Sequence, residues 1–125
     1  MPSGIGAWAV ADGLELTDDL DAVLASGPDA VMMLRVQRER MSGGFFPTAR
    51  EYTVGFGLTR ERLRALSAAN PEAVICHPGP MNRGLEIAAD AADAAQSLVL
   101  DQVSAGVAVR MAVLYHLLAG EEVAS

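Results

Sequence analysis

The sequence predicts an α/β fold: part of a doubly wound parallel sheet with flanking helices and a long C-terminal helix. Two apolar runs, 29–36 and 73–76, have the composition of strands buried on both faces of a parallel sheet. Stretches of helical pattern precede, separate and follow these runs, which is the alternation of a doubly wound sheet. With 125 residues, 51% of them hydrophobic, the chain is one compact domain or a piece of one.

The first elements are expected near the N-terminus. Residues 14–16 fit a short strand, and Thr17 is expected to cap a helix that runs to about Ala25. Acidic residues in the first turn favour this helix, because negative charge stabilises the positive end of the helix dipole. The helix should stop at Gly27, and the buried strand at 29–36 follows.

The middle of the chain combines a loop with two helices. Residues 41–47 contain two glycines and two phenylalanines, which suits either a mobile lid or a loop anchored to the core. Thr48 and Glu51 form a capping box that opens a short helix, and Thr59 opens a second one. The charged residues at 60–64 are expected to form a solvated face.

The last third holds the second strand, a weakly helical stretch at 88–95 and a long helix at about 96–119. Arg110 lies beside the apolar stripe of that helix, so we expect it to be largely buried and paired with Glu86. The stripe is expected to pack on the sheet, and it consists of residues at spacings of three and four: Leu100, Val103, Val107, Met111, Leu114 and Leu118.

Charge restricts the partners. The net charge of −7 and pI near 4.6 argue against nucleic acid or an anionic membrane as partner, because both would repel the chain. The N-terminus does not have the pattern of a signal peptide, and the apolar stretch around Arg110 is expected to be too short to span a bilayer. A single cysteine, Cys76, is expected to be a buried, unreactive thiol, which fits a cytoplasmic protein.

Polar side chains follow the first apolar run where it ends. While the chain stays extended, Arg35, Gln37 and Glu39 alternate onto one side. The planar fork of arginine binds a carboxylate with two hydrogen bonds, and Glu39 is placed to orient it. This pattern predicts a pocket for a small acidic molecule with an amino group. The alternative is an ordinary solvated run of charges.

The second apolar run leads into a loop between two prolines. This loop should present fixed backbone carbonyls at Pro78, Gly79 and Pro80, with Asn82 and Arg83 supplying polar side chains beyond them. If the two strands are neighbours, both loops face one crevice at the carboxyl ends of the strands, where such sheets bind ligands. The alternative is an ordinary turn.

Histidine chemistry is not expected to dominate. His77 has the position of a general base, but a histidine between a buried strand and a proline is more often a hydrogen-bonded structural residue. Because His77 and Cys76 point to opposite faces of a strand, a metal site is not expected. No cofactor is indicated.

At these two loops the sequence resembles the aspartate/ornithine carbamoyltransferase family, and within it the aspartate enzymes most strongly. The resemblance covers about residues 20–120. It rests on the motifs MLRVQRER at 33–40 and HPGPMNRGLEI at 77–87, and on the segments at 96–103 and 109–114.

The resemblance implies roles for individual residues. Arg35 would bind a carboxylate of L-aspartate, and Gln37 would help to place it. Glu39 would brace Arg35, and Arg40 would pair with a second domain when the cleft closes. The carbonyls of Pro78 and Gly79, with Pro80 holding the turn, would accept hydrogen bonds from the carbamoyl amide group of carbamoyl phosphate and from the incoming amine.

The resemblance also implies what is missing. Residues 1–125 would be a single incomplete aspartate-binding domain, without the domain that binds carbamoyl phosphate, and the intact enzyme would be a homotrimer. The chain alone is expected to be inactive. Two alternatives remain: ornithine carbamoyltransferase, which usually has a cysteine where this chain has Pro78, and a noncatalytic module that binds an acidic metabolite or docks on a full-length carbamoyltransferase.

Overall fold

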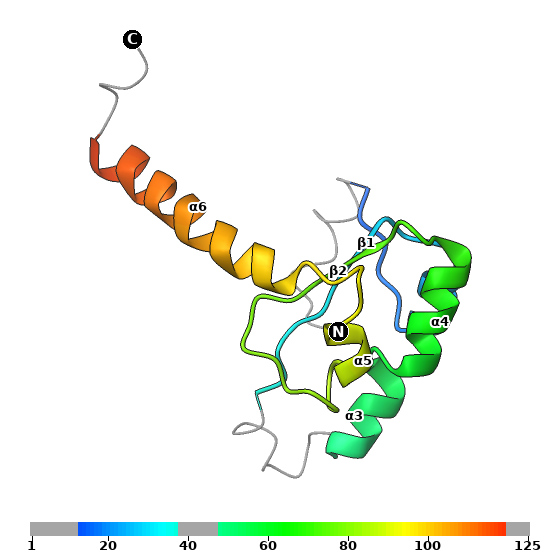
Figure 1. Cartoon of the computed structure of the whole chain (residues 1–125). Coiled ribbons are helices and arrows are strands. Elements are labelled where there is room, and N and C mark those ends of the chain that lie inside the picture. Colours follow the sequence, from blue (N-terminus) through cyan, green and yellow to red (C-terminus); the bar gives the residue numbers. More distant parts are fainter. Residues whose placement is uncertain (1–12, 38–47, 120–125) are drawn as a thin grey trace.

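The computed structural model describes residues 13–37 and 48–119, and it confirms the α/β fold with a parallel pair of strands (Figure 1). The strands are short, and the longest helix is the last. In chain order the elements are α2 (Leu20–Ala25), β1 (Ala30–Met32), α3 (Ala49–Phe56), α4 (Arg60–Ala69), β2 (Val74–Cys76), α5 (Ala89–Ala92) and α6 (Val99–Ala119).

The sheet brings the two predicted strands side by side. β1 and β2 pair in parallel, with Val31 opposite Ile75 in the register. The segment just before α6 lies along β2, where the Ile75 N–H donates to the Gln96 carbonyl over 2.9 Å and the Leu98 N–H donates to the Ile75 carbonyl over 2.8 Å. β2 therefore lies between β1 and this segment.

The core lies between the sheet and the helices α2, α4 and α5. It is built from apolar side chains of every one of these elements, which is why the short strands hold together. Its fully or almost fully buried members include Leu24, Leu58, Leu66, Ile75, Ile87 and Ala91.

The helix starts follow the predicted capping chemistry in the middle of the chain. Thr48 caps α3, with its Oγ1 accepting from the Glu51 N–H over 3.3 Å while the Glu51 carboxylate accepts from the Thr48 N–H over 2.7 Å. Thr59 caps α4 by accepting from the Arg62 N–H over 3.3 Å. Both predictions are confirmed.

Two predictions for the N-terminal part are wrong. Residues 14–16 form no strand and are exposed. The first described helix begins at Leu20, and its cap is Asp19, whose side chain accepts from the Ala22 N–H over 2.9 Å. Thr17 instead accepts from the Asp19 N–H over 3.1 Å. Aspartate and threonine are both good caps, so the local pattern did not decide between the two positions.

The first strand is less buried than its composition predicted. Val31 is half-buried, whereas Ala30 and Met32 on the other face are exposed. Side chains alternate across a strand, and the described segments cover mainly the face of the sheet that carries Ile75. Cys76 is likewise half-buried rather than buried.

The long helix departs most from expectation. α6 leaves the rest of the molecule after its first turn and extends away from it (Figure 1). Val99 is its one buried residue, while the six residues of the predicted stripe are between 47% and 84% exposed. The prediction that this stripe packs on the sheet is therefore wrong. A stripe shows that a helix has an apolar face, but not which segment covers that face.

Arg110 shares this outcome. It is exposed on α6, so it is neither buried nor paired with Glu86. The Glu86 carboxylate binds His77 and Asn82 instead. Because the helix does not return across the core, its arginine stays in solvent.

The length of α6 also corrects a prediction. This helix has 21 residues, and an 18-residue window in it has a mean hydropathy of 1.3. By length and composition it meets the requirement for crossing a membrane, so the stretch around Arg110 is not too short. Core helices of soluble proteins meet the same requirement of length and composition.

Candidate functional site

Both predicted loops leave the same edge of the sheet. β1 and β2 are parallel neighbours, so their carboxyl ends lie together. Beyond them the Met33 N–H donates to the Cys76 carbonyl over 2.9 Å. The Asn82 side chain then donates from Nδ2 to the Val36 carbonyl over 2.9 Å. The segment 33–37 is therefore joined by one hydrogen bond to the end of β2 and by another to the loop 77–87.

His77 is a buried structural residue of this edge. Its Nδ1 accepts from the Gly79 N–H over 2.8 Å, so Nδ1 carries no proton. Nε2 lies 3.0 Å from Glu86 Oε1 and is therefore the protonated nitrogen, which donates to the carboxylate. The backbone N–H of His77 donates to Gln102 Oε1 of α6 over 2.9 Å. Each polar atom of the ring is thus used inside the protein.

Glu86 is a fully buried carboxylate next to this histidine. Burial raises the pKa of Glu86, but hydrogen bonds from the Asn82 backbone N–H and from His77 outweigh it, so the pKa lies below the ordinary value. Oε1 accepts from Asn82 over 2.7 Å, while Oε2 has no partner within the described part of the chain. Burial raises the pKa of Tyr52, and the charge of Glu86 adds to that shift.

The Pro-Gly-Pro turn presents open acceptors. Pro78 and Pro80 are exposed and Gly79 is half-buried. Within the described residues no donor reaches the carbonyl oxygens of these three residues. Gly79 has a φ of 65°, a conformation that side chains disfavour, and an added Cβ would lie 3.3 Å from Val103 Cγ2 of α6. The turn is thus shaped for a glycine at this position.

The first loop presents its polar side chains outward. Arg35 and Gln37 are exposed, and Val36 between them is buried. This alternation places both polar side chains on the solvent side of the segment that Asn82 holds. Glu39, Arg40 and the predicted lid at 41–47 lie outside the described residues.

Asn82 and Arg83 differ from the expectation that both serve the loop. The side-chain amide of Asn82 donates a hydrogen bond to the Val36 carbonyl, and this bond connects the two loops. Arg83 forms a two-pronged ion pair with Asp93 at the end of α5, at 2.8 and 2.9 Å, which lowers the pKa of Asp93. Arg83 therefore belongs to the support of α5.

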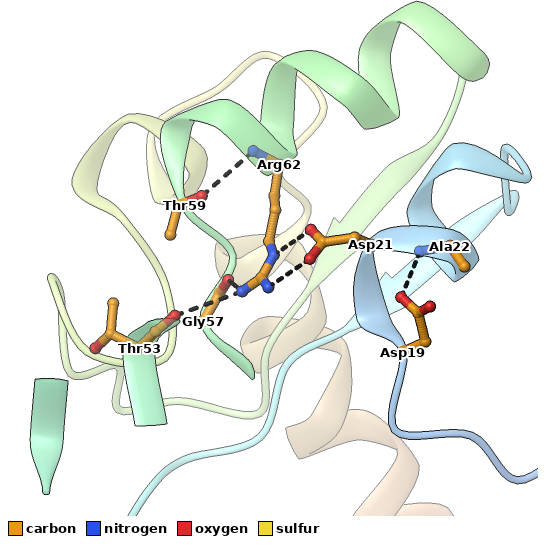
Figure 2. A network of polar contacts seen from close by, with 7 residues as sticks. All are labelled: Asp19, Asp21, Ala22, Thr53, Gly57, Thr59 and Arg62. Carbon is orange, nitrogen blue, oxygen red and sulfur yellow. Dashed lines mark hydrogen bonds and ion pairs between the residues drawn. The ribbon is translucent and has the colours of Figure 1, made fainter. Parts of the chain in front are cut away.

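A surface hollow of about 500 Å³ lies elsewhere, against α3 and α4. Figure 2 shows the guanidinium group of Arg62 there, turned toward Asp21 of α2 and toward the carbonyls at the end of α3. Because that guanidinium is already paired, the hollow offers no open cationic group. The strand ends carry the stronger candidate site.

Comparison with known proteins covers both loops. Residues 10–117 match the family model described as aspartate/ornithine carbamoyltransferase, Asp/Orn binding domain. The chain belongs to the aspartate/ornithine carbamoyltransferase family. Both quoted motifs lie within the matched residues, so the resemblance seen in the sequence is confirmed.

Several curated relatives that are similar to this chain are named aspartate carbamoyltransferase catalytic subunits. The protein of Beutenbergia cavernae is 58% identical over 96% of this chain and 34% of its own length. That of Nocardioides sp. is 57% identical over 98% of this chain and 35% of its own length. The protein of Mycobacteroides abscessus is 59% identical over 96% of this chain and 35% of its own length. The chain spans about a third of the length of these family members.

Sequence reasoning missed how the family motif is held in shape. The sequence pattern pairs Glu86 with Arg110 and indicates no role for Gln102. In the structure Glu86 accepts from the His77 ring, and Gln102 accepts from the His77 backbone N–H. The signal for Glu86 was present in its position at the end of the 77–87 motif. The partner of Glu86 was not predictable from the sequence, because Glu86 meets His77 only once the loop 77–87 has folded back on itself.

Proposed function

We propose that the protein carrying this chain transfers the carbamoyl group of carbamoyl phosphate to the amino group of L-aspartate, which gives N-carbamoyl-L-aspartate and phosphate in pyrimidine biosynthesis. The observation that carries the proposal is the identity of 54–59% to aspartate carbamoyltransferase catalytic subunits over nearly the whole chain. In the reaction the amine nitrogen bonds to the carbamoyl carbon, the bond from that carbon to the phosphate oxygen breaks, and the amine loses a proton.

The two loops divide the binding work in this proposal. Arg35 binds a carboxylate of L-aspartate and Gln37 helps to place it, with Glu39 and Arg40 in support. The carbonyls of the Pro-Gly-Pro turn, Pro78, Gly79 and Pro80, accept hydrogen bonds from the NH₂ of the carbamoyl group and from the amine. What supports this division is that Asn82 joins the two loops and that the turn carbonyls are open.

The same proposal includes the organisation of the intact enzyme. Residues 1–125 are an incomplete aspartate-binding domain, the carbamoyl-phosphate-binding domain is not among them, and the enzyme is a cytoplasmic homotrimer. Aspartate is favoured over ornithine because the curated relatives at 57–59% identity are aspartate enzymes. An arginine at position 35 suits a carboxylate and would repel the ammonium group of ornithine. The comparisons give no support to a noncatalytic module.

The test is a chimera in which residues 10–117 replace the matching segment of the Beutenbergia cavernae catalytic subunit. The chimera is expected to form N-carbamoyl-L-aspartate, whereas the 125 residues alone are expected not to, because the phosphate leaving group would lack its cationic partners. In the chimera, Arg35→Ala should lower kcat/KM for L-aspartate by about 100-fold, the loss expected for a charge-assisted, two-pronged contact.

The matched control is Arg64→Ala, which removes an equal charge from an exposed position of α4. It should change kcat/KM by less than about threefold. A chimera that uses L-ornithine in preference to L-aspartate would show that the proposed substrate is wrong. An Arg35→Ala chimera as active as the Arg64→Ala chimera would remove Arg35 from the site.

A further inference from the structure

The buried carboxylate of Glu86 connects two chains of hydrogen bonds that end at different loops. Its Oε1 atom accepts from His77 Nε2 over 3.0 Å and from the Asn82 N–H over 2.7 Å. Glu86 and His77 are both fully buried, and no lysine or arginine of the described segments binds this carboxylate. A buried carboxylate without a cation is costly, so its two donors must be held firmly in place for the fold to tolerate it.

The first chain of contacts leads to the Pro-Gly-Pro turn. Glu86 fixes the proton of His77 on Nε2, which leaves Nδ1 to accept from the Gly79 N–H over 2.8 Å. Gln102 takes the backbone N–H of His77. With these N–H groups turned inward, the carbonyls of the turn are left open.

The second chain of contacts leads to the other loop. Glu86 holds the backbone of Asn82, and the Asn82 side chain holds the Val36 carbonyl over 2.9 Å. Val36 is buried, and its neighbours Arg35 and Gln37 are exposed. The position of the Val36 carbonyl therefore fixes the backbone from which the Arg35 and Gln37 side chains extend.

We propose that Glu86 and Asn82 are positioning residues that hold the two substrate loops in register with each other. Neither touches substrate in this scheme. Glu86 acts through His77 and Asn82, and Asn82 acts through Val36. The identity of the ligands rests on the proposed function, whereas the coupling between the loops is a property of this chain and is measured without ligand.

The first experiment follows the backbone amide and histidine-ring signals of the ¹⁵N-labelled chain by NMR. In the unmodified chain His77 should show the neutral form with its proton on Nε2. Glu86→Ala should change that ring signature and shift the amides of Gly79, Arg35 and Gln37 together. Glu86→Gln should restore the original pattern, because its amide oxygen can accept the same two hydrogen bonds.

The second experiment separates the two chains of contacts. Asn82→Ala removes the contact with Val36 but keeps its own N–H, so it should shift the amides of Arg35 and Gln37 and leave the His77 ring signals unchanged. The matched control is Asn70→Ala. It also removes an amide group that donates to backbone carbonyls, at Gly27 and Pro28, and should leave both loops unchanged.

Two results would overturn the coupling. In the first, Glu86→Ala shifts only the signals within 77–87. In the second, Asn82→Ala shifts the amide signals of Arg35 and Gln37 no more than the Asn70→Ala control does. Calorimetric titration of the chimera adds the link to function, since Asn82→Ala should weaken L-aspartate binding about fivefold to tenfold. Absence of L-aspartate binding to the unmodified chimera counts against the proposed function, whereas the amide signals alone decide the positioning roles.

Discussion

Arg62 of α4 joins its own helix to α2 and to the end of α3 through one guanidinium group. It pairs with the Asp21 carboxylate of α2 at 2.7 and 2.9 Å, and Nη1 donates over 2.8 Å to the Gly57 carbonyl that follows α3. Its side chain is only 11% exposed, so the expected solvated face at 60–64 is wrong at this position. The carbonyls at a helix end need donors, and Arg62 supplies one from the neighbouring helix.

We predict that Arg62→Ala lowers the free energy of unfolding by about 2 kcal/mol, because it removes the two-pronged pair with Asp21 and the side-chain donor of the Gly57 carbonyl, which keeps only the Thr59 N–H. Arg62→Lys should recover only part of this loss, since an ammonium group cannot form the two-pronged pair. Urea unfolding measures both. Arg64→Ala, from the exposed side of α4, should stay within about 0.5 kcal/mol of the unmodified chain. Equal loss in the Arg62 and Arg64 variants would contradict the structure.

Glu86 makes the stability of the fold depend on pH. Its pKa is lowered in the folded state, so it contributes stability above its unfolded pKa near 4.5, and this contribution is lost as the pH falls through the folded pKa. We predict a shallower acid loss of stability for Glu86→Gln than for the unmodified chain below about pH 4.5. Unfolding followed from pH 6 to pH 3 measures this difference, with the exposed Glu61→Gln as the control. Parallel curves for Glu86→Gln and the unmodified chain would refute the assignment.

At the scale of elements, the caps of α3 and α4 were predictable, whereas the cap of α2 and the surroundings of α6 were not. Thr48 and Thr59 are caps in the structure because a capping contact reaches only three residues along the chain. The packing of α6 depends on which surface of the protein contacts it. Among the described segments, only the first turn of α6 is buried against such a surface. This difference in range explains why the predicted start of α6 lies within three residues of the observed one, whereas the prediction that its apolar stripe packs on the sheet is wrong.

We predict that hydrogen exchange will separate α6 from α4. Backbone amides near Leu66 of α4 belong to the core, whereas those from Gly106 to His116 are in a helix whose side chains are exposed. Local opening of α6 needs no loss of core contacts, so these amides should exchange at least about tenfold faster than those near Leu66. Mass spectrometry after deuterium exchange measures this ratio. Equal protection would mean that a surface covers α6 in solution.

At the scale of the whole molecule, one edge of the sheet collects the features proposed for substrate binding. Parallel pairing brings the segment 33–37 beside the loop 77–87, and the hydrogen bond from the Asn82 side chain to the Val36 carbonyl fixes that arrangement. The chain spans about a third of its curated relatives. Much of the apolar surface that the described residues leave open lies on α6, where Leu118 is 84% exposed, and further examples are Met32 of β1 at 54% and Val54 of α3 at 68%.

The sequence by itself determined the order of the elements from α2 onward, the caps of α3 and α4, the two apolar runs as strands of a parallel sheet, and the family motifs. These features depend on short-range spacing or on recognisable local patterns. Only the tertiary structure decided that Glu86 binds His77 rather than Arg110, that Arg62 joins three elements, and that α6 projects into solvent. The physical reason is that these contacts join side chains far apart in sequence or across a folded turn, and their partners are set by how the elements pack.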